Sequence, residues 1–192
     1  MKKKGLAMVL ALVLLAVCAV SGTVAWLTAK SDTVTNTFTT SDITVKLQET
    51  TGTEYKMVPG YEIKKDPKAW VVDGSEECYL FVKLEKSANF DSFLTYEIAD
   101  GWTQLTMDKD GNAITDLVYY RKVLTADIGT AYSVLKNDQV TVLGTVTKEQ
   151  MNALNAAGAV KPTLTITAYA SQLYKNNTET FTAAEAWANV SP

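Results

Sequence analysis

The stretch Cys78–Glu85, which reads CYLFVKLE, carries the strongest β-strand signal in the chain. Aromatic and aliphatic residues of this kind favour a pleated strand. Successive side chains of a strand point to opposite faces, so Cys78 shares a face with Leu80, Val82 and Leu84. We expect Cys78 to be packed within this apolar face, and an interchain disulfide is the alternative.

Short β-rich segments, separated by turn signals, lie on both sides of this stretch. Ile43–Gln48 alternates strictly, and Asp100-Gly101 between two apolar segments predicts a hairpin. Such spacing predicts an all-β protein, a jelly-roll-like β-sandwich. The expected strands are Ile43–Gln48, Ala69–Val72, Cys78–Glu85, Leu94–Ile98, Trp102–Met107, Leu117–Leu124, Ala131–Leu135, Gln139–Val146 and Thr163–Ala170.

Two capping boxes predict short helices in the second half of the chain. In Thr147–Gln150 the threonine hydroxyl is placed to cap the amide three residues on, and Gln150 is placed to reciprocate. Thr182–Glu185 repeats this pattern before Ala186 and Trp187. Neither helix is long enough to organise the fold.

The N-terminus has the features of an export signal. Met1–Lys4 is basic, Leu6–Val20 is an unbroken apolar run, and small residues follow. The run is shorter than the ~20 residues that span a membrane, so a signal helix cleaved after Ala25 is favoured over an uncleaved anchor. The expected organisation is a signal peptide at 1–25, an extended segment at 26–40 and the β-sandwich domain at 41–192.

Composition indicates one globular domain. The 192 residues are 47% hydrophobic and 20% charged, which suits one packed domain. Loss of the predicted signal peptide, which carries three lysines and no acid, takes the net charge from −3 to −6. This acidic surface disfavours nucleic acid and anionic membranes as partners. The other cysteine, Cys18, leaves with the signal peptide.

The sequence offers little for catalysis. There is no histidine, which removes the serine and cysteine triads and the helix-borne zinc site. Cys78 has no imidazole to activate it. Glu76 and Glu77 are adjacent and would point to opposite faces of a strand. No catalytic residue, metal ligand or cofactor is therefore predicted, and the chain is not expected to be an enzyme.

Two other motifs have residues that could form a binding site. Asp108–Asn112 resembles the start of a calcium loop, but its twelfth position is Tyr119 instead of glutamate, so a hairpin turn is favoured. Trp102, Tyr119 and Tyr120 offer an aromatic platform for a ligand. Core and cross-strand packing is the default for such residues in a sandwich.

The segment 26–40 is Thr-rich and polar, with few apolar side chains. Its composition favours an extended chain that cannot form a core alone. The apolar residues expected to act as anchors are Trp26, Leu27, Val34 and Phe38. A frayed terminus and an ordinary first strand are the alternatives.

These residues resemble a known family. Ala25-Trp26-Leu27-Thr28, followed by Asn36-Thr37-Phe38-Thr39 and an alternating strand, resembles the export signal and mature start of the TasA/camelysin family of Gram-positive bacteria. The family's glycine after this motif is replaced by Ser41 or Asp42. The further segments that look like recurring parts of the family are Val58–Gly60, Glu77–Lys83, Val118–Tyr120, Ala168–Ala170 and Ala186–Trp187.

The resemblance implies a jelly-roll subunit of extracellular biofilm-matrix fibres. In such fibres the N-terminal segment of one subunit completes the sheet of the next, after cleavage between Ala25 and Trp26 by a dedicated signal peptidase. The expected partners are further copies of the chain, the peptidase during export and an accessory matrix protein, at the cell surface or in the extracellular matrix. Strand addition of this kind uses the unpaired backbone groups of a sheet edge.

Two alternatives stay open. A monomeric secreted adhesin or carbohydrate-binding module is compatible with a sandwich that bears aromatic residues. A camelysin-like secreted peptidase is the second alternative, although the sequence offers no plausible zinc site.

Overall fold

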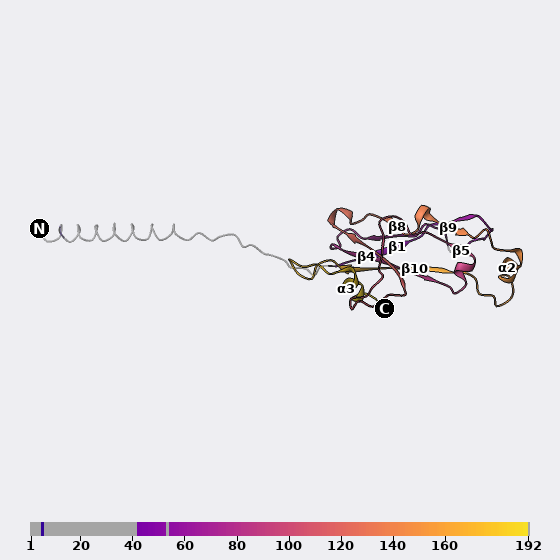
Figure 1. Cartoon of the computed structure of the whole chain (residues 1–192). Coiled ribbons are helices and arrows are strands. Elements are labelled where there is room, and N and C mark those ends of the chain that lie inside the picture. Colours follow the sequence, from indigo (N-terminus) through magenta and orange to yellow (C-terminus); the bar gives the residue numbers. More distant parts are fainter. Residues whose placement is uncertain (1–4, 6–41, 53, 192) are drawn as a thin grey trace. The chain divides into compact units, whose positions relative to one another are not determined.

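The computed structural model describes residues 5, 42–52 and 54–191. The chain divides into two compact units, and the second, residues 40–192, contains every strand described below. This unit is mostly β-structure, with three antiparallel sheets and two short helices (Figure 1). The signal helix and the extended segment predicted for residues 1–40 lie outside the described residues, apart from Gly5.

The strands form three sheets. A four-stranded sheet has the order β10-β4-β7-β6, and two three-stranded sheets have the orders β1-β3-β8 and β2-β9-β5. The bounds are β1 Val45–Gln48, β2 Glu62–Lys64, β3 Lys68–Val71, β4 Cys78–Lys86, β5 Leu94–Thr95, β6 Thr103–Gln104, β7 Leu117–Val123, β8 Tyr132–Ser133, β9 Gln139–Val142 and β10 Leu164–Gln172. The helices are α2 Lys148–Ala153 and α3 Ala183–Ala188, and the 3-10 turns are η1 Phe90–Ser92, η2 Thr125–Asp127 and η3 Lys136–Asp138.

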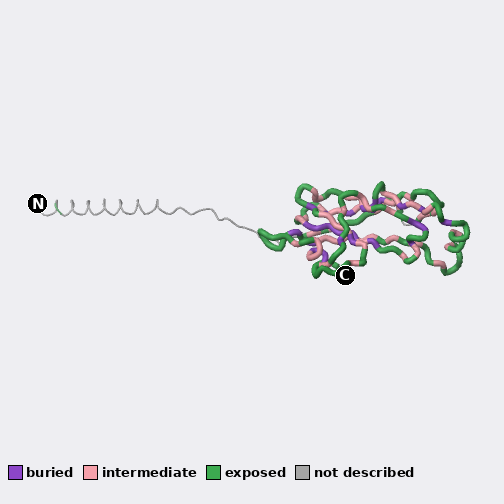
Figure 2. Tube along the Cα trace, in the orientation of Figure 1, coloured by how far each residue is buried: buried purple, intermediate pink, exposed green. Residues whose placement is uncertain are grey.

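β4 is the central strand, and both of its faces are buried. Cys78, Leu80 and Val82 belong to the larger of two apolar clusters and are 0% exposed. The sequence-based prediction that Cys78 packs in this face is confirmed. Figure 2 shows the buried segments gathered in the interior of the unit, beneath exposed loops. A strand that reads as a near-continuous apolar run is suited to this two-sided burial.

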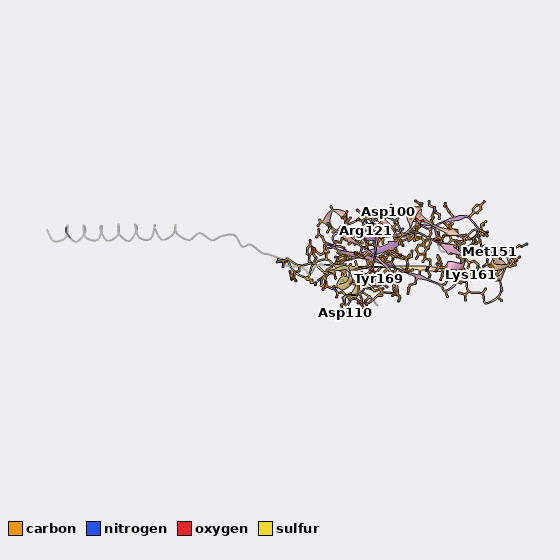
Figure 3. The ribbon with its side chains drawn as sticks, in the orientation of Figure 1. Asp100, Asp110, Arg121, Met151, Lys161 and Tyr169 are labelled. Atoms are coloured by element: carbon orange, nitrogen blue, oxygen red, sulfur yellow. The ribbon has the colours of Figure 1, made fainter. Side chains whose placement is uncertain are left out.

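The second apolar cluster covers the outer face of the four-stranded sheet. Tyr79 and Phe81 of β4 contribute to it, together with Trp187 of α3. The Phe81 and Trp187 rings lie 5.2 Å apart between centroids, and Trp187 meets Tyr169 of β10 edge-on at 5.2 Å. Figure 3 labels Tyr169 near α3. The short helix therefore seals one face of the sheet.

Both helices begin at the predicted capping boxes. In α2 the Thr147 hydroxyl accepts from the Gln150 amide at 3.2 Å, and the Gln150 side chain accepts from the Thr147 amide at 2.8 Å. In α3 the Glu185 amide donates to the Thr182 hydroxyl at 3.2 Å. Local side-chain chemistry thus determines where each helix starts.

The predicted hairpin at Asp100-Gly101 is wrong. The segment before it, β5, pairs with β9, and the segment after it, β6, pairs with β7. The chain therefore changes sheets at this turn instead of folding back on itself. Gly101 still serves a turn, since its φ of +86° lies in the region that glycine tolerates.

The remaining strand predictions agree with the structure to within a few residues, but β2 was not predicted. Ile43 and Val45 are half-buried against the larger core, as the alternation predicts, but Leu47 is 37% exposed. β1 is less buried at its C-terminal end, and the loop beyond it bonds to Asp66, whose carboxylate accepts from the Thr50 amide at 2.9 Å.

Candidate functional site

β10 is an edge strand as long as the central strand that it pairs with. It is bonded to β4 over its full length, from Leu164 opposite Lys86 to Gln172 opposite Cys78. No strand among the described residues lies on its other side. A long strand with an unpaired row of amides and carbonyls is a template for another extended chain.

The register of the ladder shows which backbone groups face outward. The Leu173 amide donates to the Glu77 carbonyl at 3.1 Å, and the Ser87 amide donates to the Thr163 carbonyl at 3.0 Å. Hydrogen-bonded pairs alternate with non-bonded pairs in an antiparallel ladder, so the odd-numbered residues of β10 bond to β4. The even-numbered residues direct their amides and carbonyls away from β4: Leu164, Ile166, Ala168, Ala170 and Gln172.

The side chains of four of these residues, all except the exposed Gln172, face the core but are not fully covered. Ile166 and Ala168 pack against the larger apolar cluster and are only half-buried. Val45, at the start of β1, and Ile43, two residues before it, are also half-buried against this cluster. β1 is the edge strand of its own sheet, and it approaches β10 to within 8 Å between Cα atoms without forming a ladder. Two sheet edges and a row of half-buried apolar side chains thus lie together.

A side-chain cluster links the four-stranded sheet to β8, the strand at the other edge of the β1 sheet. The Arg121 guanidinium of β7 lies 3.4 Å from the ring centroid of Tyr132 and 5.4 Å from that of Trp102. The Trp102 indole donates to the Ser133 carbonyl at 2.8 Å, and burial lowers the pKa of Arg121. These contacts join the four-stranded sheet to the β1 sheet through β8, the strand farthest from β1 in that sheet.

The predicted cleavage site and anchor residues cannot be compared with this edge, because all of them lie outside the described residues. They are Ala25, Trp26, Leu27, Val34 and Phe38.

Cys78 and Glu77, two of the residues considered for catalysis, have structural surroundings that explain them. Burial raises the pKa of the Cys78 thiol to about 12, which leaves the unreactive thiol form at neutral pH. Glu77 accepts from the Thr125 amide at 2.9 Å and from the Tyr174 hydroxyl at 2.8 Å, and these bonds lower its pKa. Within 42–52 and 54–191, no group of acidic or cysteine side chains is arranged to hold a metal ion.

The two weaker motifs are also explained by folding. The Asp108 carboxylate accepts from the Asp110 and Asn112 amides at 2.9 and 2.8 Å, which closes a turn, as predicted. Tyr119 packs on the larger cluster, and Tyr120 packs on the smaller one, across the sheet. Trp102, Tyr119 and Tyr120 therefore do not form one platform.

A comparison of the chain with models of protein families, with curated proteins and with solved structures finds no match. None of the helices in the described part of the chain is long and apolar enough to cross a bilayer.

Sequence reasoning missed three features. The edge position of β10 depends on strand order, which no local pattern reveals. The Arg121 cluster joins side chains from β7, from β8 and from Trp102, the residue just before β6. The left-handed backbone of Asn137 and Asp138, with φ of 56° and 53°, was also missed, although asparagine and aspartate tolerate this conformation better than most residues.

Proposed function

We propose that the protein is a secreted structural subunit that polymerises by strand addition at the β10 edge. The observation that carries this proposal is the nine-residue β10 strand, unpaired on its outer side within the described residues and bordered by half-buried apolar side chains. An added strand would bond the outward backbone groups and cover the exposed parts of these side chains. The finer architecture that we propose is a jelly roll completed by that strand.

The donor that we propose is the segment 26–40 of another copy. Extended at roughly 3.3 Å per residue, it would reach about 50 Å, which exceeds the roughly 30 Å spanned by β10. Its threonines favour an extended chain that stays soluble, and Trp26, Leu27, Val34 and Phe38 supply apolar groups for the half-buried row. Each backbone hydrogen bond formed in assembly would contribute about 0.5–1.5 kcal/mol.

Export processing would control assembly in this proposal. Cleavage after Ala25 releases the N-terminal end of the donor segment, so an unprocessed chain would hold the donor at the membrane. Polymer would then form outside the cell, at the surface or in the extracellular matrix. The resemblance of residues 25–39 to the TasA/camelysin motif supports this order of events.

A proline substitution tests the edge without opening the fold. Ala168→Pro removes an outward amide of β10 and leaves every bond to β4 in place, since Ala168 belongs to a non-bonded pair. Proline is tolerated on edge strands when its missing amide faced solvent. Electron microscopy of the processed variant should show no fibres, while circular dichroism shows an unchanged domain.

The matched control is Glu62→Pro on β2. The Val142 amide donates to the Tyr61 carbonyl at 2.9 Å, so the next pair, Glu62 and Thr141, is non-bonded. The Glu62 amide therefore faces away from β9, as the Ala168 amide faces away from β4, but on a different sheet. This variant should form fibres normally. Deletion of 26–38 should leave a folded, monomeric domain. Fibres that persist in Ala168→Pro or in the deletion variant would overturn the proposal.

A further inference from the structure

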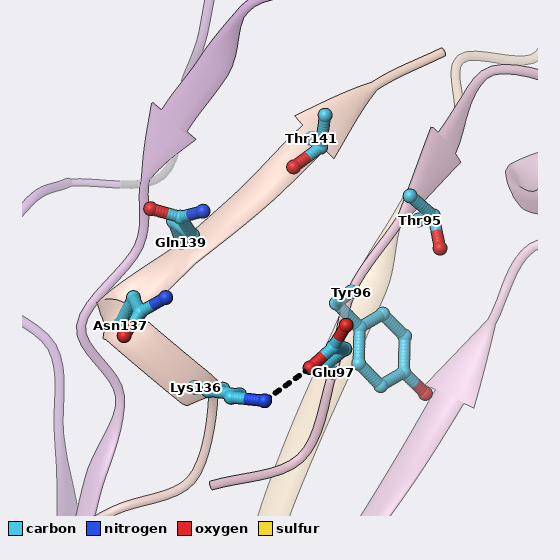
Figure 4. A pocket seen from close by; sticks show the side chains of 7 residues that line it. All are labelled: Thr95, Tyr96, Glu97, Lys136, Asn137, Gln139 and Thr141. Atoms are coloured by element: carbon cyan, nitrogen blue, oxygen red, sulfur yellow. Dashed lines mark hydrogen bonds and ion pairs between the residues drawn. The ribbon is translucent and has the colours of Figure 1, made fainter.

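A polar pocket of about 250 Å³ opens between β5 and β9 (Figure 4). Its origin is an interruption in the ladder between these strands. Thr95 is opposite Thr141 in β5 and β9, but the next contact is the Lys136 amide donating to the Glu97 carbonyl at 2.9 Å. One residue on one side of the gap, Tyr96, therefore faces four on the other, residues 137–140, and the two chains separate.

The backbone at this gap is held in an uncommon conformation. Asn137 and Asp138 both have left-handed φ angles, of 56° and 53°. The same residues also interrupt the pairing on the opposite side of this strand. There the Lys65 amide donates to the Asp138 carbonyl, and the Val134 amide donates to the Pro67 carbonyl. Between these two bonds, residues 135–137 lie opposite the single residue Asp66. Bulges and left-handed non-glycine residues are concentrated at functional sites.

The pocket is rich in unused hydrogen-bonding groups. Gln139 forms a non-bonded pair with Lys64 of β2, so its backbone amide and carbonyl point into the gap, and they bond no other backbone group of the described chain. The side chains that line the pocket are those of Thr95, Tyr96, Glu97, Lys136, Asn137, Gln139 and Thr141. Of these, only Lys136 and Glu97 are joined by a side-chain hydrogen bond in the described structure, at 2.7 Å.

The charge and polarity of the walls define the ligand. Lys136 and Glu97 neutralise each other at one end, which disfavours a strongly charged ligand. The walls are mostly polar, which disfavours an apolar ligand, since most small-molecule pockets are lined mainly by apolar groups. Tyr96 adds a ring whose position is held by edge-on packing against Phe90 at 5.8 Å. A neutral molecule with several hydroxyl groups matches donors, acceptors and one aromatic wall together.

We propose that this pocket binds one neutral sugar residue, either free or as a unit of a surface glycan. A volume of about 250 Å³ accommodates a single sugar ring. The hydroxyls of Thr95 and Thr141, the amides of Asn137 and Gln139, and the exposed backbone groups of Gln139 are its hydrogen-bonding partners. The pocket lies on a different sheet from the β10 edge, so this inference does not rest on the proposed assembly.

Saturation-transfer difference NMR on the full chain tests the proposal. The probes are glucose, galactose and N-acetylglucosamine at about 10 mM, which exceeds a dissociation constant of ~1 mM tenfold. At least one sugar should give ring-proton signals. Thr141→Val removes a hydroxyl with little change in shape, and Asn137→Gly removes an amide while tolerating the left-handed backbone. The double variant should weaken binding by at least about tenfold.

The control variant is Thr103→Val, which makes the same chemical change on an exposed position of β6. It should bind like the unaltered protein, and the melting temperatures of all variants establish that each is folded. The proposal is overturned if none of the three sugars gives a signal, or if the signal survives in the folded double variant. A glutamine derivative with both ends blocked is measured as a peptide probe. A signal from this probe, with none from the sugars, would overturn the proposal in favour of peptide recognition.

Discussion

β4 and β10 are neighbours of equal length in one sheet, yet they differ in almost every physical respect. β4 is bonded on both sides and buried on both faces, with Leu80, Phe81 and Val82 all 0% exposed. β10 is bonded on one side in the described structure, and most of its residues are half-buried. Their sequences already differ in this way: CYLFVKLEK begins with five apolar residues in a row, whereas LTITAYASQ alternates threonine with small and aliphatic residues.

The contrast in pairing and burial indicates different roles for the two strands. β4 carries the stability of the domain, because both apolar clusters meet on it. β10 has unpaired outward backbone groups and partly covered apolar side chains within the described residues, which is what the proposed strand addition would use. The comparison predicts that substitutions in β4 unfold the domain, while substitutions at the outer side of β10 mainly affect what binds there.

The largest effect is expected for Phe81→Ala. Phe81 is fully buried and contacts the Trp187 ring of α3, so its loss leaves a cavity between sheet and helix. The free energy of unfolding should fall by about 3–5 kcal/mol. Urea denaturation followed by tryptophan fluorescence measures this change. If the free energy of unfolding falls no more in Phe81→Ala than in Ile166→Ala, the central role of β4 is contradicted.

A second effect is expected at alkaline pH and originates at Cys78. Its pKa is raised to about 12 by burial, so the folded state holds this proton more tightly than the unfolded state does. Stability is therefore complete below the ordinary thiol pKa, about 8.5, and falls as pH rises from there toward 12. The slope from this one group is at most about 1.4 kcal/mol per pH unit.

The Cys78→Ala variant isolates that contribution. Tyr96, whose pKa burial also raises to about 12, destabilises the protein over an overlapping range in both forms. The difference in unfolding free energy between the two proteins should shrink as pH rises above about 8.5. A difference that is constant with pH would show that Cys78 is accessible enough to ionise in the folded domain.

A smaller effect is expected for Ile166→Ala on β10. Ile166 is only half-buried, so truncation should cost about 1–2 kcal/mol in the unassembled domain, below the range for fully buried isoleucine. Urea denaturation of the variant lacking 26–38 provides the measurement. A cost above that of Phe81→Ala would show that the β10 side chains are already covered in the isolated domain.

The smallest effects are expected at the helix caps. Thr182→Ala removes the cap of α3, which covers β4, and should cost about 1 kcal/mol. Thr147→Ala makes the same change in α2, whose residues are not buried, and should cost about half as much. Thermal unfolding of the two variants checks the order, and a reversed order would mean that α3 does not stabilise the outer face of β4.

The sequence predicts what depends on neighbours along the chain. β4, β7, β10 and both capped helices follow from local composition and periodicity. The hairpin prediction at Asp100-Gly101 failed because the turn signal is local, whereas the choice of partner strand is made by residues far away in sequence. The same reason explains why β5 and β6 belong to different sheets.

The candidate sites are harder to predict for the same physical reason. The open edge of β10 exists only because β10 is last in the strand order. The polar pocket exists only because two ladders fall out of register at Asn137 and Asp138. An asparagine-aspartate pair is a weak signal for left-handed backbone, and nothing local indicates that Thr95 and Thr141 face the gap beside it.

Hydrogen exchange along β10 is the most direct test of the assembly proposal. In the unassembled variant lacking 26–38, the odd-numbered residues of β10 should have protected amides, and Leu164, Ile166, Ala168, Ala170 and Gln172 should exchange rapidly. In fibres of the processed chain, quenched exchange read out by NMR should show those five amides protected as well. Rapid exchange of the five in intact fibres, or protection of all β10 amides in the isolated variant, would contradict the account.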